Sequence, residues 1–554
     1  MIDITSNKKK TFDKIIVFSF FLIFFIVGTR IFTSYGIPID AEANKILGYM
    51  TMNYINEIFF NSELSNTNSS SLNDYLQGNK DTAAWWYDLS HGAFLVTIFA
   101  YFDVLFGIEE TKTQYFIRHY SCFVLFFISV YFFYLIGKFR FKSRKFGLLG
   151  CIFLVLSPRI FAESFYNVKD IVFLSLFIIS LYCCLKYIYK PSLKHSIFFS
   201  LTAALATDIR VMGIMLPILV CFFILILSLR EKNFFNKNYL NIIFFLFLTP
   251  LFMYIFWPYL WPDPIDNFII AFKTLSDFPL DIKNLYFGDY IYSYYLPWHY
   301  SLIWIFITTP IIYLFFFVFG FIVSSNRLLQ RLLNIDERKK FNDLWRGKIE
   351  MIDLMILLNF FIPIFLIIIL NSTLHDGWRQ LYFVYPSLLL LSVYGIEKII
   401  NKIKKKKIYT YFVVIIVIVL FINLINMIKI HPHQYAYFNF LAGKNVEKNF
   451  EVDYWGVSNK QAIEHILLTD MNKYKIYAAS NMDLYSSKLI FSEYEKKKIE
   501  IVGKKSDADF IITNRRFWSG DTNASFAKIP DNFEIFKEIR TDRAIIVSIY
   551  KKSF

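Results

Sequence analysis

The sequence predicts an all-α polytopic membrane protein that carries a small soluble α/β domain at its C-terminal end. Three observations lead to this class. Of the 554 residues, 56% are hydrophobic, apolar stretches recur along most of the chain, and the last part alternates helix-like and strand-like patterns. Soluble domains contain only about 45–50% apolar residues, so the composition already separates this chain from them.

Apolar stretches of about 20 residues, long enough to cross a bilayer, mark the predicted spans. The first one follows the basic sequence NKKK and has no small-residue cleavage site, so we expect a retained anchor rather than a signal peptide. Shorter apolar stretches lie near residues 91–107, 146–161 and 196–207. The bilayer-length stretches lie near residues 14–33, 118–137, 170–189, 211–229, 239–257, 300–323, 351–370, 381–399 and 408–428.

The basic residues indicate how these spans are oriented. The net charge is +15, and Lys and Arg gather in connectors between spans, which is typical of membrane topology and does not favour a nucleic-acid partner. Because cytoplasmic loops carry an excess of Lys and Arg, we place these connectors and the N-terminus in the cytoplasm. The stretch 91–107, which contains Asp103, must then be interfacial or re-entrant, which leaves about eleven spans. The basic connectors are residues 138–145, 186–194, 230–237, 327–348 and 398–407.

The same orientation divides the chain into two domains. Residues 1–430 form the predicted transmembrane domain, with a first outer loop at 34–117, and residues 431–554 form a domain outside the membrane. In the second domain, the helix-like NKQAIEHILL precedes the strand-like KIYAAS, KIEIV, ADFIIT and AIIVSIY, which predicts a small α/β domain. We expect a multi-pass protein of a bacterial inner or plasma membrane, with this domain on the extracytoplasmic face.

Charged side chains gather at the outer ends of the predicted spans, in four connectors. Charges at membrane depth are costly and usually functional, although any single one can also be a helix-end charge in the headgroup zone. Carboxylates that accept a proton, next to cations that hold a departing phosphate, are what sugar transfer from a lipid phosphate needs. The charged residues are Asp40 and Glu42, then Arg159, Glu163, Lys169 and Asp170, then Asp208 and Arg210, and finally His375, Asp376 and Arg379.

Aromatic residues of the first outer loop are candidates for binding the substrate. The sequence TAAWWYDLSHG contains Trp85, Trp86 and Tyr87, whose rings would stack on sugar faces. An interfacial aromatic belt predicts the same pattern. We group these three residues with His91 and Glu163 as the predicted substrate-binding set.

An acidic pair in a long first outer loop, an acidic residue at the start of a span and a late outer H-x-x-x-R segment together resemble the GT-C superfamily of membrane glycosyltransferases. The resemblance is strongest to glycosyltransferase family 39, the protein O-mannosyltransferase and aminoarabinose transferase type, and covers roughly residues 14–400. It implies a GT-C-like fold and an inverting transfer of a hexose or pentose from a polyprenyl-phosphate donor to a hydroxyl group of a lipid, glycan or protein acceptor.

The resemblance also implies roles for particular residues. Asp40 would be the general base, with Glu42 as its rival, and Asp170 would support the acceptor or a metal ion. The spacing of the acidic residues is not a metal-ligand signature. A divalent ion between Asp40 and Asp170 is nevertheless an open alternative, and no other cofactor is expected. The lipid phosphate would be bound by His375, Arg379, Arg210, Arg159 and Lys169.

Two other functions remain open. A transporter or lipid flippase should show paired halves and charges near the middle of its helices, whereas the charges here lie at helix ends and no half-repeat is evident. A polymerase or ligase of cell-surface glycans would share large outer loops and polyprenyl substrates. Arg-rich outer loops without an early acidic pair would favour that reading. The long outer loop 257–300 is either a lid over the site or an inert surface loop.

Overall fold

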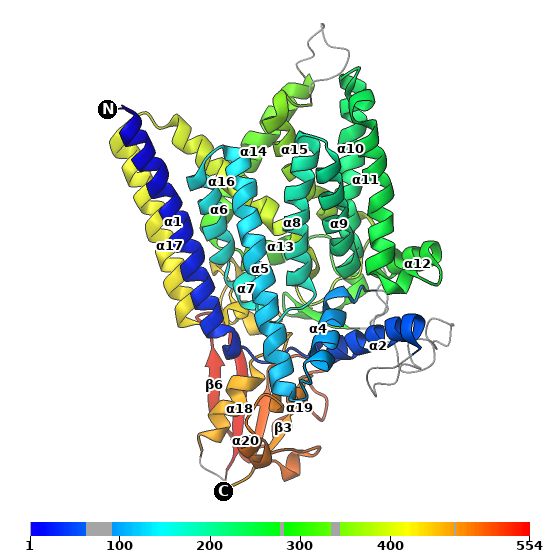
Figure 1. The fold of residues 1–554 in the computed structure, drawn as a ribbon. Coiled ribbons are helices and arrows are strands. Elements are labelled where there is room, and N and C mark those ends of the chain that lie inside the picture. Colours follow the sequence, from blue (N-terminus) through cyan, green and yellow to red (C-terminus); the bar gives the residue numbers. More distant parts are fainter. Residues whose placement is uncertain (1, 62–90, 277–281, 334–343, 470–471, 554) are drawn as a thin grey trace.

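The computed structural model describes residues 2–61, 91–276, 282–333, 344–469 and 472–553. In this part of the chain, nine helices are long and apolar enough to cross a membrane, which confirms the predicted all-α membrane protein. They form a bundle, with the C-terminal sheet below one of its ends in Figure 1. The nine are α1 (Ile2–Ile31), α5 (Thr111–Phe141), α8 (Asp170–Tyr189), α10 (Met215–Arg230), α11 (Phe234–Phe256), α14 (Ile311–Leu333), α15 (Gly347–Ile369), α16 (Tyr385–Lys402) and α17 (Lys406–Lys429).

Two shorter helices run alongside these spans. Helix α6 (Arg144–Val155) packs against α5, and α9 (Leu193–Ile209) packs between α8 and α11. The predicted span 300–323 is wrong in one respect, because the chain there forms α13 (Tyr300–Thr308) and then α14. Pro310 separates the two helices, since its ring nitrogen has no hydrogen to donate within a continuous helix.

Helices α2 (Ala41–Phe60) and α4 (Phe94–Leu105) lie across one end of the bundle (Figure 1). They approach closely at Gly48, where a Cβ atom would come within 2.3 Å of the Val96 carbonyl oxygen. Asp103 of α4 is buried and pairs with Arg118 of α5 at 2.6 Å. The 12 residues of α4 extend about 18 Å, which is shorter than a bilayer core of about 30 Å, so an interfacial position remains the prediction.

The C-terminal region contains a five-stranded sheet of order β4-β3-β5-β7-β6, in which β3 is parallel to β4 and β5 whereas β7 is antiparallel to its neighbours. The four predicted strands correspond to β3, β4, β5 and β7. Strand β6 was not predicted; it is an edge strand whose residues 534–537 are exposed and mix charged with apolar side chains. The strands are β3 (Tyr474–Ala478), β4 (Ile499–Ile501), β5 (Phe510–Thr513), β6 (Phe533–Arg540) and β7 (Ile545–Lys552).

Two further segments join the bundle to this sheet. The long connector 257–300 forms α12 (Pro264–Ser276) and a hairpin of β1 (Lys283–Tyr286) with β2 (Asp289–Tyr292). Residues 434–458 return from α17 and lie between the bundle and the sheet, where Tyr286 forms an isolated bridge with Phe450. One large apolar core contains residues of both the helix bundle and the C-terminal sheet, so the sheet packs directly against the bundle.

Candidate active site

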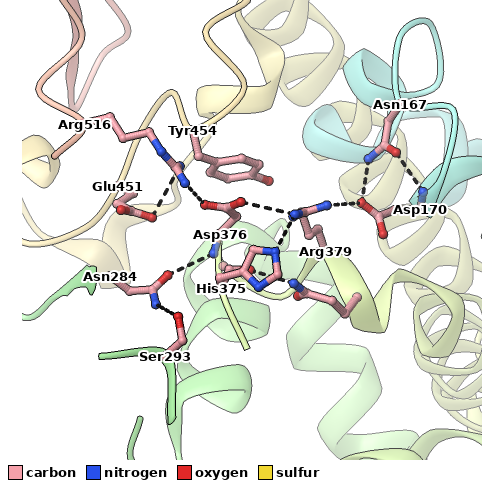
Figure 2. A network of polar contacts seen from close by, with 12 residues as sticks. Asn167, Asp170, Asn284, Ser293, His375, Asp376, Arg379, Glu451, Tyr454 and Arg516 are labelled. Carbon is pink, nitrogen blue, oxygen red and sulfur yellow. Dashed lines mark hydrogen bonds and ion pairs between the residues drawn. The ribbon is translucent and has the colours of Figure 1, made fainter. Parts of the chain in front are cut away.

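Asp170, the first residue of α8, is the centre of a buried polar cluster. Arg379 donates to its Oδ2 atom at 3.1 Å, and Arg210 pairs with its Oδ1 atom. Asn167 donates to Oδ2 at 3.0 Å, and its own Oδ1 accepts the Asp170 backbone N–H at 2.7 Å (Figure 2). Two arginines and an amide thus compensate a carboxylate that is 1% exposed.

The turn at residues 375–379 presents three polar side chains to this cluster. Asp376 and Gly377 both have positive φ angles, +59° and +75°, and the turn packs close to Trp304. Arg379 donates to the Nε2 atom of His375 at 2.7 Å and lies 3.3 Å from Asp376. Burial lowers the pKa of His375 to about 3, so this ring is a neutral acceptor that orients Arg379 and is not itself a cation.

The cluster continues into the C-terminal domain. Asp376 pairs with Arg516, which follows strand β5, and Arg516 lies 3.8 Å from Glu451 (Figure 2). Although burial opposes it, the charges of Arg516 and Arg379 lower the pKa of Asp376, whereas burial raises the pKa of Glu451 to about 7. Six buried charges of alternating sign therefore form one chain: Glu451, Arg516, Asp376, Arg379, Asp170 and Arg210.

A second group of side chains surrounds Glu163. Tyr382 and Tyr454 both donate to its Oε1 atom, at 2.5 and 3.0 Å, and Asn167 donates to Oε2 at 2.8 Å. Burial raises the pKa of Glu163. Arg159 donates to the Tyr454 hydroxyl at 3.2 Å, and its guanidinium group lies among aromatic rings. Asn167 thus links this group directly to Asp170.

The structure separates the two carboxylates of the first loop. Burial raises the pKa of Asp40, and the charges of Lys169 and Arg379 lower it, so this carboxylate lies within electrostatic reach of the cluster. Glu42 instead accepts a hydrogen bond from Tyr115 of α5 and lies 3.9 Å from Lys45, with 43% of its side chain exposed. Of the pair, Asp40 is therefore the stronger candidate for the base.

The other predicted residues take different places. His91 precedes Gly92, whose backbone N–H donates to the Asp208 carbonyl at 2.8 Å. Trp85, Trp86 and Tyr87 lie outside the described residues. Among the residues that are described, no three His, Cys, Asp or Glu side chains come together as a metal site. Both oxygens of Asp170 accept from arginine, so this carboxylate does not fit a metal ion.

An apolar groove with a volume of about 390 Å³ begins beside the cluster. It lies between α10 and α15, and the polar residues in its lining are Arg210, Ser372, Thr373 and Gln380. Arg210 therefore belongs both to the groove and to the pair with Asp170. The side chains of the two helices that line it are Met215, Ile218, Leu219 and Phe222 on α10, and Leu358, Ile362, Leu366 and Ile367 on α15.

Several members of the site were missed in the sequence. Asn167 carries a weak local signal, because Asn side chains often accept a backbone N–H two residues later in a turn, as Asn167 accepts from Lys169. Glu451, Tyr454 and Arg516 carry none, since they lie in a region predicted as a separate domain. The groove was also missed, because its lining consists of ordinary apolar helix residues.

Comparison with known proteins agrees with the interpretation of the membrane part. Residues 98–257 match the family model of dolichyl-phosphate-mannose-protein mannosyltransferases. Over this range, the match agrees with the predicted resemblance to the protein O-mannosyltransferase type. This range contains Arg159, Glu163, Asp170 and Arg210, whereas Asp40 and the turn 375–379 lie outside it. Among curated protein sequences, none matches this chain.

Three of the solved structures that align with this chain have low sequence identity. ArnT from Cupriavidus metallidurans bound to undecaprenyl phosphate has 10% identity and a TM-score of 0.44, with 97% of each chain covered. Its apo state has 10% identity and a TM-score of 0.42, covering 96% of this chain and 98% of that one. An Archaeoglobus fulgidus oligosaccharyltransferase in the apo form has 12% identity and a TM-score of 0.43, covering 76% of this chain and 57% of that one.

Proposed function

We propose that this protein is a membrane glycosyltransferase that transfers a sugar from a polyprenyl-phosphate donor to a hydroxyl acceptor with inversion. The observation that carries the proposal is the apolar groove whose lining includes Arg210, one of the two arginines on Asp170. A polyprenyl chain gains free energy by burying apolar carbon, and its phosphate would then meet the guanidinium groups of Arg210 and Arg379 in charge-assisted hydrogen bonds.

The reaction needs a base that deprotonates the acceptor hydroxyl and cations that stabilise the departing phosphate. Asp40 accepts the proton of the acceptor hydroxyl, whose oxygen attacks the anomeric carbon and forms the new glycosidic bond. The bond between that carbon and the phosphate oxygen breaks, and its electron pair leaves with the polyprenyl phosphate. Because burial raises the pKa of Asp40, its carboxylate is a stronger base than an exposed aspartate.

Arg379 and Arg210 stabilise the charge that develops on the departing phosphate. Asp170 holds both guanidinium groups, so we assign it the role of positioning them rather than of binding a metal. His375 holds Arg379 through its neutral Nε2 atom and is likewise a positioning residue. These roles refine the sequence-based expectation, in which His375 met the phosphate directly.

We infer that this chemistry takes place on the extracytoplasmic face of a bacterial inner or plasma membrane. The basic connector 138–145 joins α5 to α6 at the end of the bundle farthest from the C-terminal sheet (Figure 1). The candidate site lies at the sheet end, where Asp170 begins α8. Because basic connectors remain in the cytoplasm, the sheet and the site are expected outside.

The proposal is tested by filling the groove. Purified protein in nanodiscs is assayed for transfer from radiolabelled polyprenyl-phosphate hexoses and pentoses. Ile362→Trp, which narrows the groove, should raise the donor KM by about tenfold, equivalent to about 1.4 kcal/mol, while the melting temperature is kept. The matched control is Val417→Trp on the exposed side of α17, where the native side chain is 58% exposed. Equal donor KM values in the two variants, or no transfer from any polyprenyl donor, would contradict the proposal.

A further inference from the structure

A second cavity, with a volume of about 570 Å³, lies where α14 and α17 meet the C-terminal domain. It shares no lining residue with the groove beside Arg210. On the bundle side its wall is mainly apolar and includes Ile311, Ile312, Val419 and Ile422. The opposite wall belongs to the C-terminal domain and carries charged side chains. The cavity is therefore amphipathic, with its polarity divided between the two domains.

Polar atoms on the bundle side mark the boundary between these walls. Asn423 and Asn426 lie near the end of α17, about one turn apart, and both line the cavity. Asn423 is held by a hydrogen bond of 2.6 Å to the Leu156 carbonyl. Asparagine within a membrane helix is costly unless it faces protein or a polar cavity. The two amides thus mark the depth in the bilayer at which the headgroup of a bound lipid would begin.

Cationic and acidic side chains share the opposite wall. Lys444, Arg540 and Arg543 line it together with the acidic Glu447 and Asp542, and Arg540 is paired with Glu538. The Glu447 carboxylate accepts the Ile545 backbone N–H at 3.3 Å. Arg543 donates one N–H to the Gly443 carbonyl at 3.0 Å, which places its guanidinium group near Lys444. Its other N–H groups can donate to an anion.

A path leads from the bilayer into the cavity. Ile415, Ile418 and Ile422 follow one another along α17 at helical spacing, and each is more than half exposed, at 57%, 51% and 52%. Residues three and four apart share one helix face, so these side chains form a continuous apolar strip. The strip ends at Asn426, which lines the cavity together with the charged side chains of the opposite wall.

We propose that this cavity binds one anionic phospholipid from the surrounding bilayer. Its phosphate lies against Lys444 and Arg543, and its acyl chains follow the isoleucine strip of α17 and the start of α14. Basic pockets beside membrane helices are suited to anionic headgroups. Because the ligand contacts both domains, its binding stabilises their junction. Phe438, which also lines the cavity, lies 5.3 Å from the Arg159 guanidinium group, so this junction forms the outer support of the Glu163 group.

The test compares unfolding in nanodiscs of phosphatidylcholine with and without phosphatidylglycerol, which adds negative charge at equal chain length. The wild-type melting temperature should rise by about 3 °C with phosphatidylglycerol, and inorganic phosphate added to phosphatidylcholine discs should produce no rise. The combined variant Lys444→Gln, Arg543→Gln should lose the rise. A matched control, Lys405→Gln, Lys407→Gln, removes two exposed lysines at the other end of α17 and should keep it.

Native mass spectrometry keeps the test decisive if the Arg543 change weakens folding. Wild-type protein should retain one phosphatidylglycerol molecule, and Lys444→Gln alone should reduce that occupancy about tenfold. An equal rise in the combined variant and its control, the same occupancy in Lys444→Gln as in wild type, or a rise with inorganic phosphate alone would overturn the proposal. None of these measurements depends on sugar transfer.

Discussion

Two buried ionic clusters occupy opposite ends of the helix bundle. One is the chain of charges around Asp170, beside the C-terminal domain. In the other, Arg140 at the end of α5 pairs with Asp353 of α15, which also takes Arg327 of α14 at 2.8 Å. Both clusters bury arginine and aspartate, so burial and charge alone do not distinguish a reactive site from a structural one.

The way in which the arginines are used does distinguish them. Arg140 donates through Nε and one terminal nitrogen to both oxygens of Asp353, a bidentate pair between two helices. Arg379 spreads single contacts over Asp170, His375 and Asp376. Its Nε atom and that of Arg210 are buried and have no hydrogen-bond partner among the described residues. The first arrangement locks helices, whereas the second keeps donors that a phosphate can use.

The largest effect is expected at Asp40, the proposed general base. Asp40→Asn keeps the size of the side chain but removes its proton acceptor, so transfer should fall by about 10²–10⁴-fold at an unchanged melting temperature. Glu42→Gln is the matched control, because its carboxylate is held by Tyr115 and half exposed, and it should stay near wild-type activity. Transfer assays on both purified variants check this. If Asp40→Asn keeps at least half of the activity, Asp40 is not the base.

A matched pair of substitutions separates the two clusters directly. Arg379→Lys keeps the charge but loses the planar fork, so transfer should fall by about 10–100-fold, the equivalent of one charge-assisted hydrogen bond. Its melting temperature should change little. Arg140→Lys should instead lower the melting temperature and leave transfer per folded molecule unchanged. Turnover and unfolding are measured on the same preparations, and the same pattern of losses in both variants would refute the distinction.

The smallest effect concerns pH. The pKa of Glu451 is raised to about 7 in the folded protein, so the unfolded chain releases this proton at lower pH than the folded one does. The stability that the protonated carboxyl contributes is complete below its ordinary pKa and is lost as pH rises through about 7. Glu451→Gln cannot ionise, so its melting temperature should fall less than that of wild type between about pH 5 and about pH 8. If the melting temperatures of the two proteins depend on pH in the same way, Glu451 does not titrate in this pH range.

Local sequence patterns determined the membrane fold of this protein. The length and apolar content of a stretch predict a span without knowledge of the segments that it packs against. Every helix that crosses a bilayer must have about the same apolar length and hydrogen bonds within its own backbone. Four strands of the C-terminal sheet, β3, β4, β5 and β7, also follow from local alternation patterns. One proline was enough to divide a predicted span into α13 and α14.

Tertiary structure alone decided which charges meet. Asp40 and Glu42 are two residues apart at the start of a helix, where side chains at that spacing do not share a face, so their surroundings differ. Arg516 lies more than a hundred residues after Asp376, and their pairing depends on how the sheet packs on the bundle. Contacts of this kind result from the packing of whole elements, and a single sequence carries no local pattern for them.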